Sequence, residues 1–311
     1  MSLVNLVTGG AGFIGSHLID KLISENQKVI CLDNLSTGCI SNIKKYLNNK
    51  NFLFIKKNVV EPLDFNVDRI WHFGSLASEL DYSKNPIDTI NNIFLGSNNL
   101  LQLAKKNKAR ILFASSSEIY GEYSTQSQSE KIYGNVNCFS KRACYSEGKR
   151  ASETLFYNYS EQFGVDIRVA RIFNTYGPRL SLKDGRVIGN FINNAIMGNQ
   201  LNIFGDGSQT RSFCYINDMV DALNILMNSN FKSPINLGNN TEISIINLAK
   251  LISNKVGKNL KINFLKPKEF EPYKRIPSID LAKEKLGWEP KIPLDLGLDK
   301  TINYLLFEQS N

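Results

Sequence analysis

A glycine-rich turn near the start constrains this chain of 311 residues more than any other feature. Residues 8–15 read Thr-Gly-Gly-Ala-Gly-Phe-Ile-Gly, with an apolar run before them at 3–8 and an amphipathic stretch overlapping them at 12–25. Glycines between a strand and a helix let backbone amides at the helix N-terminus approach a pyrophosphate closely. The residues that we expect to contact a dinucleotide here are Gly9, Gly12, Phe13, Ile14 and Gly15.

The first 115 residues alternate short β-branched runs with amphipathic stretches, which is typical of βαβ units and a parallel sheet. We expect strands at 3–8, 28–33, 52–56, 68–74, 109–115 and 165–173, and helices at 12–25, 38–48, 85–106 and 143–163. The polar stretch at 119–142 predicts a long loop, and loops of this length in compact domains tend to be functional.

After about residue 174, glycine and proline divide the chain into shorter elements. The predicted fold is α/β, with a Rossmann-type doubly wound parallel sheet at 1–173 and a smaller α/β lobe for the substrate at 174–311. We expect the chain to return to the first domain around 212–228. A cleft between the two parts would be the natural ligand site.

Asp33 ends the second expected strand and predicts which dinucleotide is bound. Its carboxylate can accept hydrogen bonds from a ribose hydroxyl and would repel a 2′-phosphate, so the cofactor should be NAD rather than NADP. Asn34 follows it, and Asn58 and Val59 follow the third strand near the expected adenine. The alternative for Asp33 is an ordinary turn residue at a strand end.

Tyr145 and Lys149 lie four residues apart in the helix expected at 143–163, so they share one face. A tyrosine has an ordinary pKa of about 10, and it is a poor base at neutral pH unless a positive charge favours the phenolate. The Lys149 ammonium and an oxidised nicotinamide would supply that charge. Alone, the pair could be an ordinary exposed helical pair; after a dinucleotide-binding turn, it predicts a redox enzyme.

Two more residues follow the strand at 109–115, at the edge where parallel sheets bind ligands. The hydroxyl of Ser116 can bind a substrate oxygen beside Tyr145. An alcohol dehydrogenase needs only a hydroxyl, a tyrosine and a lysine, so the added carboxylate of Glu118 indicates a second proton transfer after oxidation. Alternatively, Glu118 caps a helix or forms a salt bridge in a loop.

Composition excludes several other classes of protein. The net charge is +8, but the lysines are scattered and form no stripe with aromatic residues, which argues against nucleic-acid binding. Five cysteines without a Cys-x-x-Cys motif and only two histidines predict no disulfide framework and no metal site. No apolar run approaches about 18 residues and no signal-like segment precedes the first strand, so we expect a cytoplasmic protein without a membrane span. His72 is expected in the core.

Seven stretches resemble the extended short-chain dehydrogenases/reductases, the NAD-dependent epimerase/dehydratase family, and within it the UDP-glucuronate decarboxylases. The matching stretches are 133–137, 142–149, 168–179, 184–187, 205–215, 274–277 and 286–290. In such enzymes NAD takes a hydride from C4 of the sugar while the tyrosine, here Tyr145, takes the hydroxyl proton. Carbon dioxide then leaves from C6, C5 is protonated, and the hydride returns to C4.

The resemblance also implies roles for further residues. Glu118 would position or activate the groups that handle the C5 proton, and Arg275 would lie at the carboxylate or enolate end of the sugar. The residues implied for binding the nucleotide-diphosphate sugar are Asn174, Arg179, Arg186, Val187, Arg211 and Arg275. Each arginine could instead brace the fold. A homodimer through the helices at 85–106 and 143–163 is also implied.

Three acids depart from the decarboxylase pattern. Glu79 and Asp81 stand near the expected sugar pocket, and Asp88 replaces a residue that is usually basic. Acids would oppose the carboxylate of UDP-glucuronate electrostatically. A 4,6-dehydratase of the dTDP-glucose or GDP-mannose type, or a 4-epimerase, therefore stays open as an alternative activity on a neutral sugar nucleotide. A non-catalytic NAD-sensing protein is the alternative outside the enzymes.

Overall fold

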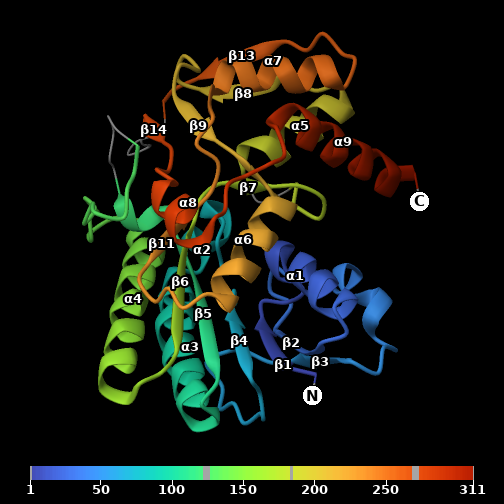
Figure 1. The fold of residues 1–311 in the computed structure, drawn as a ribbon. Coiled ribbons are helices and arrows are strands. Elements are labelled where there is room, and N and C mark those ends of the chain that lie inside the picture. Colours follow the sequence, from blue (N-terminus) through green and yellow to red (C-terminus); the bar gives the residue numbers. More distant parts are fainter. Residues whose placement is uncertain (1, 122–126, 183–184, 268–272, 311) are drawn as a thin grey trace.

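A seven-stranded parallel sheet is the centre of the molecule (Figure 1). The computed structural model describes residues 2–121, 127–182, 185–267 and 273–310. Residues 122–126 of the predicted loop and Asp184 of one matching stretch lie outside them. In sheet order the strands are β11 (Ile235–Leu237), β6 (Ile167–Ile172), β5 (Arg110–Ser116), β4 (Arg69–His72), β1 (Val4–Thr8), β2 (Lys28–Asp33) and β3 (Phe52–Lys56). This order confirms the predicted Rossmann-type sheet.

Helices cover both faces of the sheet and bury its apolar strands. One buried cluster joins Leu18 and Leu22 of α1 (Phe13–Ser24) to Met219 and Leu223 of α6 (Ile216–Asn228). The other joins α3 (Pro86–Asn107) and α4 (Ala143–Phe163) to the opposite face through residues such as Leu100. Strands buried on both faces explain the nearly continuous apolar runs in the sequence.

The helix predicted at 38–48 is wrong. The chain forms two short 3₁₀ helices there, η1 (Ile40–Asn42) and η2 (Lys44–Tyr46). The segment is instead bound to the glycine-rich turn, because the Cys39 amide and the Asn42 side chain both donate hydrogen bonds to the Ala11 carbonyl. The short helix α2 (Glu79–Lys84) was not predicted from the sequence. Its first turn is capped by the Ser78 hydroxyl.

The rest of the chain forms small sheets above the carboxyl ends of the main strands (Figure 1). These sheets are β10 (Cys214–Tyr215) with β7 (Thr175–Tyr176), β9 (Thr210–Ser212) between β12 (Glu242–Ser244) and β14 (Lys274–Arg275), and β8 (Leu201–Phe204) with β13 (Ile262–Leu265). The remaining helices are α5 (Val187–Met197), α7 (Ile245–Lys255), α8 (Asp280–Leu286) and α9 (Leu294–Ser310).

Two later elements rejoin the first part of the chain. Helix α6 packs against α1, and β11 pairs with β6 at the sheet edge. The chain thus contacts the first part again through α6, within the interval 212–228, and through the strand at 235–237. The division into domains at 1–173 and 174–311 stays a prediction. None of the described helices is both long and apolar enough to cross a bilayer.

Candidate active site

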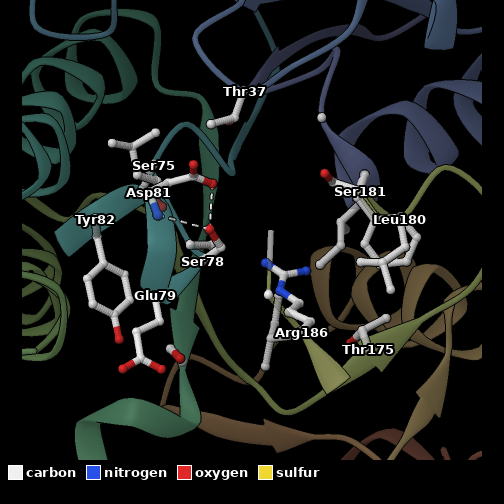
Figure 2. A pocket seen from close by; sticks show the side chains of 18 of the residues that line it. Thr37, Ser75, Ser78, Glu79, Asp81, Tyr82, Thr175, Leu180, Ser181 and Arg186 are labelled. Atoms are coloured by element: carbon white, nitrogen blue, oxygen red, sulfur yellow. Dashed lines mark hydrogen bonds between the residues drawn. The ribbon is translucent and has the colours of Figure 1, made fainter. Parts of the chain in front are cut away.

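A cavity of about 1040 Å³ opens where the main sheet meets the small sheets. The residues that were predicted for the site and that line this cavity are Gly9, Gly12, Phe13, Ile14, Gly15, Asp33, Asn34, Asn58, Val59, Ser116, Glu118, Tyr145, Lys149, Asn174, Arg179, Arg186, Val187, Arg211 and Arg275. Every predicted residue thus reaches one cavity. Figure 2 shows Glu79 and Tyr82 on one wall, and Thr175 and Arg186 on the other.

The glycine-rich turn packs so closely on neighbouring backbone that two of its positions have no space for a side chain. Gly9 has φ +67°, and a Cβ there would lie 2.8 Å from the Phe73 backbone. A Cβ on Gly15 would collide with the Gly9 carbonyl. Gly12 begins α1, and no described side chain caps this end of the helix. The amides of the first helical turn can therefore meet an anion such as a pyrophosphate.

Asp33 lies at the carboxyl end of β2 and is fixed beside that turn. Its Oδ2 accepts a hydrogen bond from the Ala11 amide at 3.0 Å, and its Oδ1 accepts one from the Leu35 amide at 2.8 Å. Burial raises the pKa of Asp33, although the two amides oppose the shift. A Cβ on Gly38 would lie 2.8 Å from this carboxylate, so Gly38 was missed as part of the cradle. Turn and carboxylate together fit NAD.

Tyr145 is buried in α4, with its ring stacked on that of Tyr82 at 5.2 Å between centroids. Burial raises the pKa of Tyr145 to about 12; hydrogen bonding to Ser116 opposes this shift, and the negative charge of Glu118 adds to it. The expected lowering of the Tyr145 pKa is therefore not produced by these side chains alone. The buried Tyr82 hydroxyl has no hydrogen-bond partner among the described residues, and the sequence alone did not identify Tyr82 as part of the site.

Lys149 projects from α4 toward β5, on the same face as Tyr145. Its Nζ donates hydrogen bonds to the Ala114 carbonyl at 2.7 Å and to the Ser75 hydroxyl at 3.0 Å. The ammonium lies 5.6 Å from the centroid of the Tyr145 ring. Burial lowers the pKa of Lys149 to about 7, and the charge of Glu153 opposes this shift.

Glu118 lies between two arginines. Its Oε1 accepts hydrogen bonds from Arg275 at 2.5 Å and from Arg142 at 2.7 Å. Burial disfavours the carboxylate, but the two guanidinium groups outweigh it and hold the pKa of Glu118 below its ordinary value. Glu118 is therefore ionised in the site. Arg142 was not predicted for the site, although it lies three residues before Tyr145 and starts one of the matching stretches.

The remaining predicted residues line the cavity, but the structure gives some of them other partners. Arg179 donates a hydrogen bond to Asp20 of α1 at 2.7 Å and adopts φ +64°. One of its nitrogens, Nη1, is buried and has no hydrogen-bond partner in the part of the chain that the structure describes. Arg211 donates hydrogen bonds to the carbonyls of Thr210 and Tyr273. Bracing of the fold, the alternative for these arginines, is therefore part of what they do.

The three unusual acids differ in their positions. Asp81 accepts a hydrogen bond from the Ser78 hydroxyl at 2.5 Å, as Figure 2 shows, and belongs to the first turn of α2. Oε2 of Glu79 lies 3.7 Å from Nη1 of Arg142 and forms an ion pair with it. Asp88 is not among the residues that line the cavity, so it does not act on a ligand there directly. The two nearer acids are thus partly compensated by neighbouring groups.

A model of the NAD dependent epimerase/dehydratase family matches residues 5–238. The chain belongs to this family.

His72 is buried, and its two ring nitrogens contact the hydroxyls of Thr8 and Ser97. This confirms the expected place of His72 in the core.

Relatives with similar sequences carry one activity in their names. UDP-glucuronic acid decarboxylase 1 of Xenopus tropicalis is 50% identical over 299 residues, which span 96% of this chain and 71% of that protein. UDP-glucuronic acid decarboxylase 3 of Arabidopsis thaliana is 47% identical over 294 residues, which span 94% of this chain and 86% of that protein.

Solved structures share the fold of the whole chain. UDP-glucose 4-epimerase of Thermotoga maritima, solved with UDP-glucose, superimposes with a TM-score of 0.91 at 29% identity and covers 99% of this chain and 100% of its own. UDP-glucuronic acid 4-epimerase of Bacillus cereus, solved with UDP-glucuronic acid and NAD, gives a TM-score of 0.89 at 27% identity with the same coverage. The family fold thus serves more than one reaction on sugar nucleotides.

Proposed function

We propose that this protein is an NAD-dependent UDP-glucuronate decarboxylase that forms UDP-xylose. The observation that carries the proposal is the ionised Glu118 between Arg142 and Arg275, in the same cavity as Tyr145. A carboxylate and two guanidinium groups beside a redox tyrosine suit a reaction with a second proton transfer and a charged sugar. The 50% identity to a relative named for this activity supports the same choice.

The glycine-rich turn and Asp33 would hold NAD, and Asn34, Asn58 and Val59 would contribute to the adenine end of the site. When bound, NAD accepts a hydride from C4 of the sugar and later returns it. The turn supplies backbone amides to the pyrophosphate, and Asp33 accepts hydrogen bonds from a ribose hydroxyl. The same carboxylate repels a 2′-phosphate, which gives the preference for NAD over NADP.

Tyr145 takes the proton of the C4 hydroxyl. With a pKa of about 12, its phenol needs further positive charge before it acts as a base at neutral pH. Lys149 contributes an ammonium beside the ring, and the oxidised nicotinamide contributes the rest. Ser116, whose hydroxyl interacts with Tyr145, orients the substrate oxygen.

Glu118 and Arg275 serve the decarboxylation. Arg275 is buried beside Glu118, and its guanidinium stabilises negative charge at the C6 and C5 end of the sugar. Because Glu118 is ionised, it positions the group that delivers the C5 proton and is not itself the resting acid. Asn174, Arg179, Arg186, Val187 and Arg211 bind the nucleotide diphosphate.

A 4-epimerase or 4,6-dehydratase on a neutral sugar nucleotide is the second candidate. Glu79 and Asp81 in the cavity wall favour it, because their charges oppose a substrate carboxylate. The ion pair between Arg142 and Glu79 reduces that opposition, and with the names of the similar relatives it is why we place the decarboxylase first.

A panel of substrates tests the choice. The purified protein is incubated separately with UDP-glucuronate, UDP-glucose, dTDP-glucose and GDP-mannose, and the products are separated by chromatography. The proposal predicts conversion of UDP-glucuronate to UDP-xylose and no conversion of the three neutral sugars. Conversion of a neutral sugar nucleotide with UDP-glucuronate left intact would establish the second candidate.

We also propose a cytoplasmic homodimer in which α3 and α4 of two copies form the interface. Apolar side chains on these helices are exposed, including Ile87 at 73% and Tyr157 at 62%. A dimer would remove this apolar surface from water. Light scattering after size-exclusion chromatography should give twice the chain mass, and replacing Ile87 by Glu should shift the mass to one chain; a monomeric wild type would refute the dimer. Separately, we propose that the boundary between the NAD-binding domain and the lobe for the sugar nucleotide lies at 173/174.

A further inference from the structure

A carboxylate that the proposed chemistry does not use lies on the helix that carries Tyr145 and Lys149. Glu153 is on α4, one helical turn beyond Lys149, and its side chain is only 12% exposed. Its Oε1 accepts a hydrogen bond from the Ser115 hydroxyl at 2.5 Å. Arg171 of β6 donates to both carboxylate oxygens, at 2.8 Å to Oε2 and at 3.1 Å to Oε1.

The partners of Glu153 join three elements that carry the site. Ser115 immediately precedes Ser116 on β5, and α4 carries Tyr145 and Lys149 on the face that holds Glu153. Arg171 lies on the neighbouring strand, opposite Ser115 in the sheet register. The position of Ser116 against Tyr145 therefore depends on the contact between Ser115 and Glu153.

The hydrogen bonds continue from Arg171 toward the other half of the site. Arg171 donates to the Tyr120 hydroxyl at 2.9 Å, and that hydroxyl donates to Asn236 at 2.7 Å. The Asn236 side chain donates to the backbone carbonyl of Gln128 at 2.9 Å, and the backbone amide of Gln128 donates to the backbone carbonyl of Ile276 at 2.7 Å. Ile276 follows Arg275, and Tyr120 lies two residues after Glu118.

We propose that Glu153 is a positioning residue, which fixes Ser116 through Ser115 and favours the charged form of Lys149 beside Tyr145. The proposal rests on the proposed function only for the identity of the sugar, because the redox centre is common to its alternatives. A buried ammonium without a nearby negative charge is costly, and it loses its proton instead. Glu153 supplies that negative charge from one turn away.

Few other charged groups face Lys149. Tyr145 lies on the same helix, and His72 lies on β4, where burial and the lysine lower the pKa of the imidazole to about 3, so it stays neutral. The Lys149 ammonium donates to the Ala114 carbonyl of β5 and to the Ser75 hydroxyl in the loop after β4, and it lies 4.8 Å from the centroid of the Phe113 ring. Arg171 of β6 faces Glu153 instead. Glu153 is therefore the acid that supports the charge of Lys149.

The test compares Glu153→Gln with Glu161→Gln, which removes a carboxylate from the exposed end of the same helix. Turnover is measured across pH with the sugar nucleotide that the wild type converts, and NAD affinity is measured separately by fluorescence. The proposal predicts for Glu153→Gln a kcat about 10- to 100-fold lower, a KM within about twofold of wild type, and an alkaline limb displaced to lower pH. Glu161→Gln should behave as wild type.

A second readout does not need turnover. In the protein without substrate, NMR of carbon-13-labelled lysine should show that one buried lysine, absent from Lys149→Met, titrates at lower pH in Glu153→Gln than in wild type. Glu153→Asp keeps the charge and should retain the wild-type titration. An unchanged titration and an unchanged alkaline limb in a folded Glu153→Gln would overturn the proposal.

A variant that does not fold would leave the same contact testable through Ser115→Ala. This change removes one hydrogen bond and should lower kcat several-fold without changing KM. An unchanged kcat in Ser115→Ala would count against positioning through Ser115. If wild type converts no UDP-glucuronate but oxidises another sugar nucleotide, the proposed function fails while the comparison of Glu153 variants still stands.

Discussion

Arg275 donates a hydrogen bond to Oε1 of Glu118 at 2.5 Å, although 157 positions separate the two residues in the chain. The contact joins the small sheet that contains β14 to the turn that follows β5. It keeps a carboxylate ionised inside a buried cavity, and Arg142 adds a second positive charge from the start of α4. This arrangement adds a charged group to a redox centre that otherwise needs only Ser116, Tyr145 and Lys149.

Replacing Arg142 by Gln should change the pH dependence of turnover. The two arginines lower the pKa of Glu118, so the loss of one raises it and the carboxylate is protonated at higher pH. The acidic limb of kcat should therefore move to higher pH. Lys141→Gln removes a positive charge from the neighbouring exposed position and should leave the limb in place. Coincident profiles for the two variants would disprove the role of Arg142.

Asp33→Asn should weaken NAD binding and reduce the discrimination against NADP. The amide keeps one acceptor for the backbone but loses the charge-assisted bond to the ribose, so Kd for NAD should rise about 10- to 100-fold. Titration calorimetry with both dinucleotides measures the change. Asp64→Asn, at an exposed carboxylate paired with Lys106, is the matched control. Equal loss of affinity in both variants would show that the effect is not local.

Tyr145→Phe should lose turnover by at least about 100-fold while NAD affinity stays within about twofold, because only the proton acceptor is removed. Tyr157→Phe, at an exposed tyrosine on the same helix, should retain turnover. Assays of product formation and fluorescence titration with NAD separate the two properties. Full turnover in Tyr145→Phe would show that Tyr145 is not the proton acceptor.

The free energy of unfolding should fall as the pH drops from about 6.5 to about 4, in part because of His17. Its ring nitrogen Nε2 donates to the Pro178 carbonyl at 2.9 Å, and burial lowers its pKa from 6.5 to about 4. The unfolded chain binds a proton in this window and the folded chain does not, so acid favours unfolding by about 1 kcal/mol per pH unit. Urea unfolding of His17→Gln should show a smaller pH dependence; parallel curves would refute this assignment.

The main sheet could be predicted because its strands carry local signals. Apolar runs mark the strands and amphipathic runs mark α1, α3 and α4, and the glycine spacing fixes the turn between β1 and α1. The helix prediction for 38–48 was wrong because of tertiary contacts. The Cys39 backbone amide and the Asn42 side chain donate hydrogen bonds to the Ala11 carbonyl in place of a continuous helix. Periodicity alone does not reveal such long-range bonds.

Site residues that belong to a motif could be predicted from the sequence. Site residues that only the fold brings into the cavity were missed. Gly9, Asp33, Tyr145 and Lys149 stand at characteristic positions after strands or on one helical face. Arg142 belongs to a matching stretch, but its bond to Glu118 depends on how α4 begins relative to β5. The sequence alone also did not predict that the pKa of Tyr145 is raised, because this shift is caused by burial of the side chain in the folded protein.

The central claim is decarboxylation, and the stoichiometry of UDP-glucuronate conversion tests it most directly. The purified protein is incubated with NAD and UDP-glucuronate isotopically labelled at C6, and carbon dioxide and nucleotide sugars are measured together. The account predicts one labelled carbon dioxide for each UDP-xylose formed, with no net consumption of NAD. Retention of the label in a nucleotide sugar, as UDP-galacturonate or as unchanged substrate, would contradict it.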